Sequence, residues 1–162
     1  MKGIKVIENG ESLDTSVEVI RNSFNTVAEE LNLKPENAPT HPSFITLDQL
    51  KELRQNGLVF YGYFLDDRQV GFVAMEKADD TLYYMEKLAV LPEYRHNGYG
   101  GELVRFVLDT AAAKGVKKLS IGIIYEQTVL KDWYKELGFE ETGIKKFEHL
   151  PFTVGFMEID LI

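Results

Sequence analysis

The sequence predicts an α/β (α+β) fold with a mixed, mostly antiparallel sheet of about seven strands, flanked by about four helices. The first observation behind this prediction is a block of three β-type runs between residues 58 and 90, separated by short polar turns. The second is a helical pattern that joins the last of these runs to a β-branched run at residues 118–124. Two strands joined in this way run parallel, in a right-handed crossover. Because no linker, repeat or low-complexity tract interrupts the chain, we expect residues 1–162 to form a single domain.

The first part of the chain predicts a strand followed by an amphipathic helix. Residues 2–8 alternate polar and apolar side chains and end at an Asn-Gly turn, as a short strand does. Apolar residues then recur at spacings of three and four over residues 17–31, after polar residues at positions 12–15 that can cap a first turn. We expect this helix to turn its apolar face, which includes Phe24 and Val27, inward.

Turn and capping signals divide the rest of the chain. Residues 46–49, Thr-Leu-Asp-Gln, read as a capping box, in which the first and last side chains satisfy free amides at a helix start. The predicted elements are a helix from this box to residue 56, strands at 58–65, 69–77 and 81–90, a helix that ends before Gly115, a strand at 118–124, a helix at 128–137, and strands near 139–142 and 152–161.

The composition excludes several kinds of site and partner. The chain has no cysteine, so disulfides, thiolate zinc sites and cysteine nucleophiles are absent. A formal net charge of -8 opposes binding to a phosphate backbone, and we expect no nucleic-acid partner. No apolar run is long enough to cross a bilayer and the N-terminus has no apolar signal region, so we expect no membrane contact and a cytoplasmic location. The histidines lie far apart in the sequence, which predicts no metal site.

A glycine-rich turn follows the strand predicted at residues 81–90. Residues 92–101 read Pro-Glu-Tyr-Arg-His-Asn-Gly-Tyr-Gly-Gly and lead into the next helix. At a helix start several backbone amides have no intrahelical partner and the helix dipole is positive, so anions bind there. Glycines let a phosphate approach these amides, and Arg95 and His96 add donors at the rim. We expect this turn to bind a pyrophosphate.

The spacing of these residues separates three known phosphate-binding patterns. A Walker A loop needs Gly-Lys-Ser/Thr, which the chain lacks, and a Rossmann fingerprint needs a glycine where Leu103 stands. Residues 95–100, Arg-His-Asn-Gly-Tyr-Gly, instead match Arg/Gln-x-x-Gly-x-Gly/Ala, which resembles the acyl-CoA signature of the GNAT superfamily of N-acetyltransferases. Residues 86–92 before the turn and residues 133–139 after it are also similar to that family, as is the order of strands and helices.

The resemblance implies a GNAT acyl-CoA N-acyltransferase fold and an enzyme that uses acetyl-CoA as co-substrate. Such an N-acetyltransferase moves the acetyl group to a primary amine by direct attack in a ternary complex. It also implies that the strand before the turn splays from its parallel neighbour and offers free backbone groups to the pantetheine arm. Relatives commonly carry asparagine where Gln127 stands, and Gln127 can keep that amide contact. The expected cofactor-binding residues are Leu88, Ala89, Val90, Arg95, His96, Asn97, Gly98, Tyr99, Gly100, Gly101 and Gln127.

Two residues are the expected catalytic groups. By resemblance, Tyr134 is the general acid toward the sulfur of coenzyme A, and the alternative is a tyrosine packed in the core. Glu86 lies where relatives often place a carboxylate that takes a proton from the amine. Strict strand alternation puts Glu86 on one face with Leu88 and Val90, where it is equally consistent with a solvated residue paired with a cation. Glu126 and an ordered water are further candidates for the base.

Two functions and several acceptors fit these patterns. The competing function is a non-catalytic acyl-CoA-binding sensor or regulatory module. The acceptor is a small-molecule or peptide amine, and the acidic balance favours a cationic one. Residues 145–151 should join the last two strands, where relatives build part of the acceptor pocket or a dimer contact; an exposed hairpin loop is the alternative. Dimerisation is common in the family, so a homodimer is one expected assembly.

Overall fold

The computed structural model describes residues 2–161, which contain seven strands and four α-helices. The strands are β1 (Lys2–Ile7), β2 (Val59–Leu65), β3 (Arg68–Lys77), β4 (Leu82–Val90), β5 (Lys118–Ile124), β6 (Glu140–Lys146) and β7 (Thr153–Asp160). The α-helices are α1 (Asp14–Glu30), α2 (Leu47–Gln55), α3 (Tyr99–Ala113) and α4 (Thr128–Glu136), and the 3-10 turns are η1 (Pro42–Phe44) and η2 (Pro92–Tyr94).

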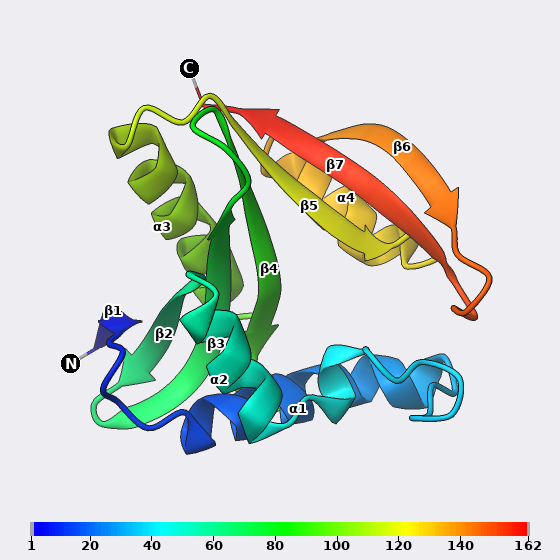
Figure 1. The fold of residues 1–162 in the computed structure, drawn as a ribbon, viewed down its shortest axis with the longest axis horizontal. Coiled ribbons are helices and arrows are strands. Elements are labelled where there is room, and N and C mark those ends of the chain that lie inside the picture. Colours follow the sequence, from blue (N-terminus) through cyan, green and yellow to red (C-terminus); the bar gives the residue numbers. More distant parts are fainter. Residues whose placement is uncertain (1, 162) are drawn as a thin grey trace.

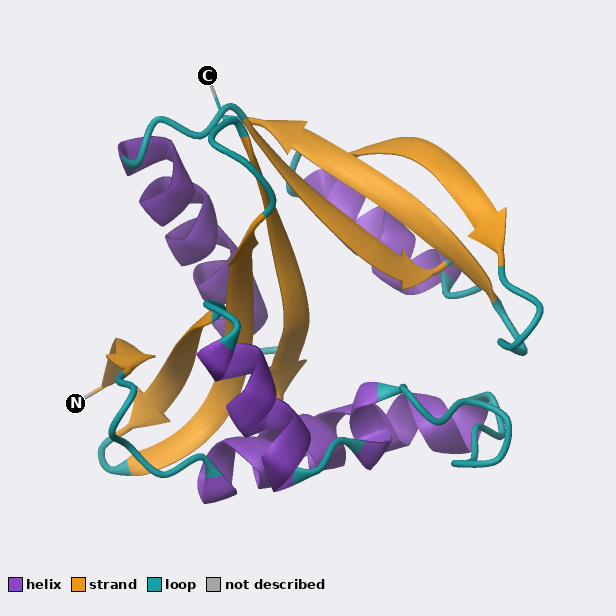
Figure 2. Ribbon diagram, viewed as in Figure 1, coloured by secondary structure: helices purple, strands orange, loops and turns teal. Residues whose placement is uncertain are grey.

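All seven strands form one mixed sheet in the order β1-β2-β3-β4-β5-β7-β6 (Figures 1 and 2). Every neighbouring pair is antiparallel except β4 and β5, which are parallel and are joined through α3. Residues 69–75 of β3 are all buried, because α1 and α3 pack against β3 and β4 from opposite faces (Figure 1). The predicted fold class and the predicted crossover are therefore confirmed.

Only part of the apolar face predicted for α1 lies in the core. Ile20 is fully buried, whereas Phe24 and Val27 are half-buried. The reason is visible in Figure 1, where α1 runs past β4 toward the loop between β6 and β7. Phe24 still packs against the core, so the predicted inward face is confirmed, although it is only half-buried beyond Ile20.

Hydrogen bonds to side chains are found at the starts of α2 and α1. Thr46 Oγ1 accepts a hydrogen bond from the Gln49 amide at 3.2 Å, and Gln49 Oε1 accepts one from the Thr46 amide at 3.0 Å. The capping box predicted at the start of α2 is therefore confirmed. At the start of α1, Ser12 Oγ accepts from the Asp14 amide at 3.2 Å, while the N-cap residue itself is Leu13.

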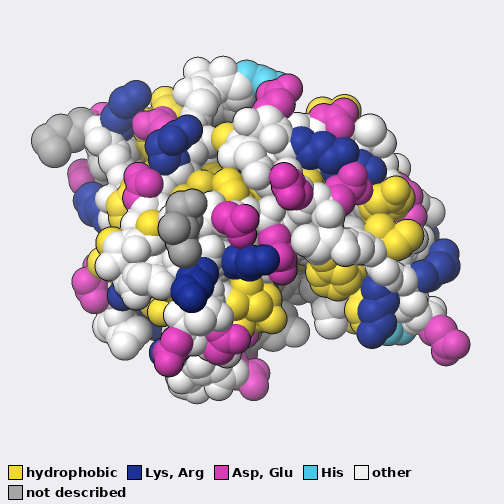
Figure 3. All heavy atoms as spheres, turned by 90° about the horizontal axis from the view of Figure 1, so that it is seen from above, with side chains coloured by type: hydrophobic (Ala, Val, Ile, Leu, Met, Phe, Trp, Pro, Cys, Tyr) yellow, Lys and Arg dark blue, Asp and Glu magenta, His cyan; other side chains and the backbone are white. Residues whose placement is uncertain are grey.

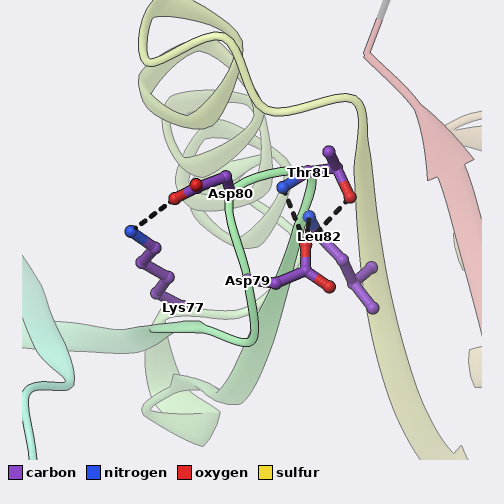
Figure 4. Close-up of polar contacts among 5 residues, drawn as sticks. All are labelled: Lys77, Asp79, Asp80, Thr81 and Leu82. Carbon is purple, nitrogen blue, oxygen red and sulfur yellow. Dashed lines mark hydrogen bonds and ion pairs between the residues drawn. The ribbon is translucent and has the colours of Figure 1, made fainter.

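The turn between β3 and β4 is held by one aspartate (Figure 4). Asp79 Oδ1 accepts hydrogen bonds from the Thr81 amide at 2.7 Å and from the Leu82 amide at 2.9 Å, which turns the chain into β4. Beside it, Lys77 Nζ forms an ion pair with Asp80 Oδ1 at 2.8 Å on the exposed surface. This tight turn lies at the end of β4 that pairs with β5.

Beyond its first residues β4 leaves β5. The parallel register stops at Tyr84, and the ribbons of β4 and β5 separate from that point (Figure 1). A β-bulge in β4 interrupts the register with β3 between Glu86 and Ala89, and Lys87 in it has a φ of 56°. Because β3 pairs Ala74 with Glu86 and Phe72 with Ala89, Glu86 and Ala89 share a face. The strict alternation expected along this strand is therefore wrong.

The strand β6 extends farther than predicted at its C-terminal boundary. β6 runs to Lys146, so Lys145 and Lys146 belong to the strand and not to the connecting loop. Every residue of β6 is exposed, because β6 is the edge strand of the sheet and lies outside the core. Among residues 2–161, no helix combines the length and the apolar character that a membrane span requires.

Candidate active site

A large cleft opens where β4 and β5 separate. Its volume is about 1780 Å³, and its walls come from β4, the glycine turn, the start of α3, β5 and α4. The C-terminal half of α1 and parts of β6 and β7 close the remaining side. The cleft brings the predicted anion site together with Glu86 and Tyr134.

The glycine turn presents unpaired backbone amides to the cleft. Gly98 is the N-cap of α3 and has a φ of 83°, a left-handed conformation that glycine adopts without strain. Asn97 donates its side-chain amide to the carbonyls of Tyr94 and Arg95 at 3.0 and 3.2 Å, which holds the bend. Within residues 2–161, the backbone amides of residues 96–101 have no hydrogen-bond acceptor. Free donors at the positive end of a helix suit a pyrophosphate.

The glycines at the start of α3 differ in their surroundings. A Cβ at Gly101 would meet no protein atom within 4 Å, whereas a Cβ at Gly100 would meet the Trp133 ring at 3.6 Å. Gly101 therefore borders open space in the cleft, and Gly100 borders α4. Open space above free amides is what a phosphate needs in order to reach them.

Arg95 points away from the position predicted for it. Its guanidinium donates to the Ser23 carbonyl at 2.7 Å, to the Thr26 hydroxyl at 3.2 Å and to the Val90 carbonyl at 3.3 Å. These bonds tie α1 to the end of β4. The expectation of a free guanidinium at the rim of the turn is therefore wrong, because α1 supplies acceptors that use its donors. His96, by contrast, is exposed beside the turn, with a φ of 65°.

Tyr99 helps to fix the start of α3. Its ring lies 4.6 Å from the ring of the buried Tyr63, whose hydroxyl donates to Glu102 Oε2 at 2.9 Å. Burial, followed by the hydrogen bond to Glu102 and its charge, raises the pKa of Tyr63 to about 12, so the phenol stays a donor. The Tyr99 side chain thus has a packing role, and the Tyr63–Glu102 contact was not indicated by any sequence motif.

The backbone of β4 meets the cleft with fewer free groups than predicted. The Val90 amide donates to Ser23 Oγ at 3.2 Å, and the Val90 carbonyl accepts from Arg95. Both backbone groups of Val90 are therefore engaged, which corrects the expectation for this residue. Ala89 pairs with Phe72, whereas Leu88 lies in the bulge and has no register partner on β3 or β5. Leu88 is the residue whose backbone best fits the predicted role.

The Glu86 carboxylate lines the cleft and is paired with a cation. Lys87 Nζ lies 2.9 Å from Glu86 Oε1, and the Lys87 and Glu86 side chains are 19% and 30% exposed, respectively. Glu76 is the diagonal neighbour of Glu86 on β3. Burial, followed by the negative charge of Glu86 and a hydrogen bond with it, raises the pKa of Glu76, and the charge of Lys87 acts in the opposite direction. Glu86 is thus ion-paired and also accessible from the cleft.

The two residues before α4 differ in what they contact. Glu126 is exposed, and its carboxylate accepts from the Thr153 amide at 3.0 and 3.1 Å, so it anchors the start of β7. Gln127 is the N-cap residue of α4 but makes no side-chain cap, and its side chain lines the cleft. Gln127 is therefore available to a ligand, while Glu126 already has a structural contact.

Tyr134 is both packed and open to the cleft. The residue is 5% exposed, and its ring packs edge-on against Trp133 at 4.9 Å and Phe139 at 5.4 Å. It also lines the cleft, and its hydroxyl has no hydrogen-bond partner within residues 2–161. Burial raises the pKa of Tyr134, which keeps the phenol protonated. The packed tyrosine expected as the alternative is therefore observed, and the role of general acid stays a prediction.

His41 lies in the wall of the cleft opposite β4, although no sequence motif indicated it. The ring is 7% exposed, and it packs edge-on against Phe24 at 5.7 Å and Phe44 at 6.2 Å. Its Nδ1 accepts from the Ser43 amide at 3.3 Å, so it caps η1. Burial lowers the pKa of His41 to about 4.

This lowered pKa makes the stability of the protein depend on pH. Between its unfolded pKa of 6.5 and its folded pKa of about 4, His41 takes up a proton in the unfolded chain but stays neutral in the folded protein. The free energy of unfolding is therefore unaffected by His41 above pH 6.5 and falls as the pH drops toward about 4. Between about pH 7.5 and about pH 5, His41 should lower the free energy of unfolding by about 2 kcal/mol. Urea unfolding of wild type and His41→Asn measures this, because asparagine keeps a cap acceptor and does not titrate. If the free energy of unfolding falls equally in both proteins over this pH range, His41 is not the group responsible.

Charges of both signs mix on the outer surface. In the face shown in Figure 3, Lys and Arg side chains lie among Asp and Glu side chains, so no broad field of one sign covers that face. The walls of the cleft also carry charged side chains of both signs. Their ionisable residues include Glu30, Glu86, Lys87, Arg95, Glu126, Lys145 and Glu158.

Comparisons with known proteins agree with this geometry. The chain matches the sequence model of the acetyltransferase (GNAT) family over residues 24–139. It is 30% identical over 82 residues to an uncharacterised N-acetyltransferase of Mycobacterium tuberculosis, which is 51% of this chain and 53% of that protein. The chain thus spans about half the length of the curated relatives that it matches first.

Two solved structures have the same fold over nearly their whole length. The PaiA N-acetyltransferase of Thermoplasma acidophilum, in complex with coenzyme A, has a TM-score of 0.77 at 19% identity, with 99% of each chain covered. A GNAT family acetyltransferase of Elizabethkingia anophelis with acetyl-CoA bound has a TM-score of 0.73 at 16% identity, covering 98% of this chain and 97% of that chain. Since the family model covers most of the sequence and the sheet has the fold of these structures, the chain belongs to the acetyltransferase (GNAT) family.

Proposed function

We propose that the protein is an N-acetyltransferase that transfers the acetyl group of acetyl-CoA to a primary amine by direct attack in a ternary complex. One observation carries the proposal: the free amides of residues 96–101 and the unpaired Tyr134 hydroxyl open into the same cleft. An anion site and a protonated donor in one cleft match the pyrophosphate and the thioester sulfur of acetyl-CoA.

The walls of the cleft suggest how acetyl-CoA would lie. The pyrophosphate would bind the free amides at the start of α3, above the unobstructed Gly101. The pantetheine arm would then follow the edge that β4 exposes beyond Tyr84, within reach of the Gln127 side chain. The backbone of Leu88, which has no strand partner, would contact the thioester carbonyl.

The residues around the thioester would each perform one step. Glu86 takes a proton from the acceptor ammonium, and the neutral nitrogen attacks the carbonyl carbon. The C–N bond forms, the C–S bond breaks, the leaving thiolate takes its proton from the Tyr134 hydroxyl, and the second proton lost by the nitrogen passes through solvent to restore the Tyr134 phenol. No covalent enzyme intermediate is required. Glu126 is the alternative base, because its carboxylate also lines the cleft, although it is bonded to the Thr153 amide.

The experiment is thiol release from acetyl-CoA against a panel of small amines and short peptides. Wild type should release thiol with at least one amine class, and Glu86→Gln should lower kcat about tenfold, because water in the open cleft replaces the carboxylate only in part. Glu126→Gln is the matched control. It keeps an oxygen acceptor for Thr153, and its kcat should stay within about twofold of wild type.

Calorimetry with acetyl-CoA separates this function from its competitor. Tight binding of acetyl-CoA without thiol release on any amine would favour the acyl-CoA sensor. A larger loss in Glu126→Gln than in Glu86→Gln would move the base to Glu126. Absence of acetyl-CoA binding would overturn the proposed function.

A further inference from the structure

Lys87 occupies an unusual backbone position in the wall of the cleft. It lies in the β4 bulge with a φ of 56°, a left-handed conformation that side chains with a Cβ rarely adopt. Glycine or asparagine fits such a position without this strain. The lysine side chain is therefore held there by its surroundings, and only 19% of it is exposed.

The amine of Lys87 is directed at the carboxylate that would serve an acceptor. Lys87 Nζ lies 2.9 Å from Glu86 Oε1, which is hydrogen-bond distance for proton transfer. The next residue, Leu88, is the one whose backbone would contact the thioester carbonyl. An acceptor ammonium that uses Glu86 would share this carboxylate with Lys87 Nζ.

The other lysine in the wall of the cleft lacks this arrangement. Lys145 is exposed, and its Nζ lies 4.8 Å from the centre of the Phe147 ring, with no carboxylate in ion-pair distance among the described residues. Lys145 lines the cleft from β6, on the side away from the bulge. Among these two amines only Lys87 has a proton acceptor in place.

We propose that Lys87 is itself an acetyl acceptor: when no other amine is present, its Nζ takes the acetyl group from acetyl-CoA bound to the same chain. This activity rests on the proposed acetyl-CoA-dependent function. Glu86 takes one proton from the Lys87 ammonium, and the neutral nitrogen attacks the thioester carbonyl. The C–N bond forms, the C–S bond breaks, and the thiolate leaves as free coenzyme A after protonation by Tyr134. The second proton lost by the nitrogen passes through solvent to restore the Tyr134 phenol. The product is an uncharged amide, so Glu86 loses its cationic partner.

Peptide mass spectrometry after incubation with acetyl-CoA alone tests this proposal. Lys77 is the internal control, because it also forms an ion pair with a carboxylate, Asp80 Oδ1 at 2.8 Å, but lies on the exposed surface (Figure 4). Uncatalysed acetylation should modify Lys77 at least as fast as Lys87. Acetylation in the cleft should modify Lys87 at least about tenfold faster than Lys77, since bound acetyl-CoA, Glu86 and the Lys87 amine are held close together.

Two variants make the interpretation specific. Glu86→Gln should slow acetylation of Lys87 about tenfold and leave that of Lys77 unchanged. Lys87→Arg keeps a cation beside Glu86 and removes the acceptor nitrogen. The acetyl groups incorporated into this variant should therefore fall to the background set by exposed lysines such as Lys77. An amine that the enzyme turns over should slow acetylation of Lys87, because both compete for the same carboxylate.

The outcomes distinguish this proposal from the function on which it rests. If amines are acetylated while Lys87 is modified no faster than Lys77, self-acetylation is refuted and the N-acetyltransferase function stands. If Lys87 is modified quickly but Glu86→Gln has no effect, the proposed proton acceptor is wrong. If acetyl-CoA neither binds nor releases thiol with any amine, both proposals fail.

Discussion

Replacing Tyr134 by phenylalanine should lower kcat for acetyl transfer about 10²- to 10³-fold and leave the Kd for acetyl-CoA unchanged. The Tyr134 hydroxyl reaches the cleft and has no hydrogen-bond partner within residues 2–161, so it is free to serve a ligand. Burial raises the pKa of Tyr134, and the phenol therefore holds its proton until a strong base, such as a departing thiolate, forms beside it. Steady-state thiol release and calorimetry with acetyl-CoA measure the two constants.

The matched control for this substitution is Tyr61→Phe. Both rings pack edge-on against an aromatic neighbour, Tyr134 against Trp133 at 4.9 Å and Tyr61 against Phe106 at 5.0 Å. Burial also raises the pKa of Tyr61, which is 6% exposed, but Tyr61 does not line the cleft. Each variant should change the free energy of unfolding by less than about 1 kcal/mol, and Tyr61→Phe should keep wild-type kcat. An unchanged kcat in Tyr134→Phe would remove this residue from the mechanism.

The features that the sequence predicted correctly depend on short stretches of chain. The capping box at residues 46–49 and the glycine turn that leads into α3 are each decided by a few consecutive residues, so local patterns were sufficient to place them. The crossover between β4 and β5 followed from one helix between two strands, since the handedness and direction of such a connection are strongly constrained. These signals also located the start of α3, where the anion site would form.

The features that the sequence did not predict depend on contacts between distant segments. Arg95 donates to Ser23 and Thr26, which lie 72 and 69 residues earlier in the chain, and nothing near Arg95 indicates those partners. The bulge in β4 was hidden for a different reason. A left-handed residue is normally signalled by glycine, asparagine or aspartate, and here the residue is Lys87. His41 was missed because it is buried by Phe24 and Phe44 and belongs to no local motif.

These distant contacts join the walls of the cleft into one unit. Through Arg95 and Ser23, α1 is bonded to the end of β4 just before the glycine turn. The start of α3 is anchored to β2 through Tyr63 and Glu102. Rigid support on both sides means that a ligand at the start of α3 meets amides that are already in place, so steric access becomes the main determinant of binding there.

Replacing Gly101 by valine should therefore raise the Kd for acetyl-CoA about 10²-fold with little effect on folding. A Cβ at Gly101 meets no protein atom within 4 Å, and the residue has no left-handed φ, so the protein itself accommodates a side chain there. The valine methyl groups would instead occupy the space from which a pyrophosphate approaches the amides. Calorimetry measures the Kd, and urea unfolding should show a change of less than about 1 kcal/mol in the free energy of unfolding.

The control is Gly3→Val, which adds the same side chain at an equally unobstructed glycine in β1. A Cβ at Gly3 would also meet no protein atom within 4 Å, and Gly3 does not line the cleft, so this variant should bind acetyl-CoA as wild type does. Wild-type affinity in Gly101→Val would mean that the phosphates do not approach the start of α3 from this side. The proposed orientation of acetyl-CoA would then have to be reversed or abandoned.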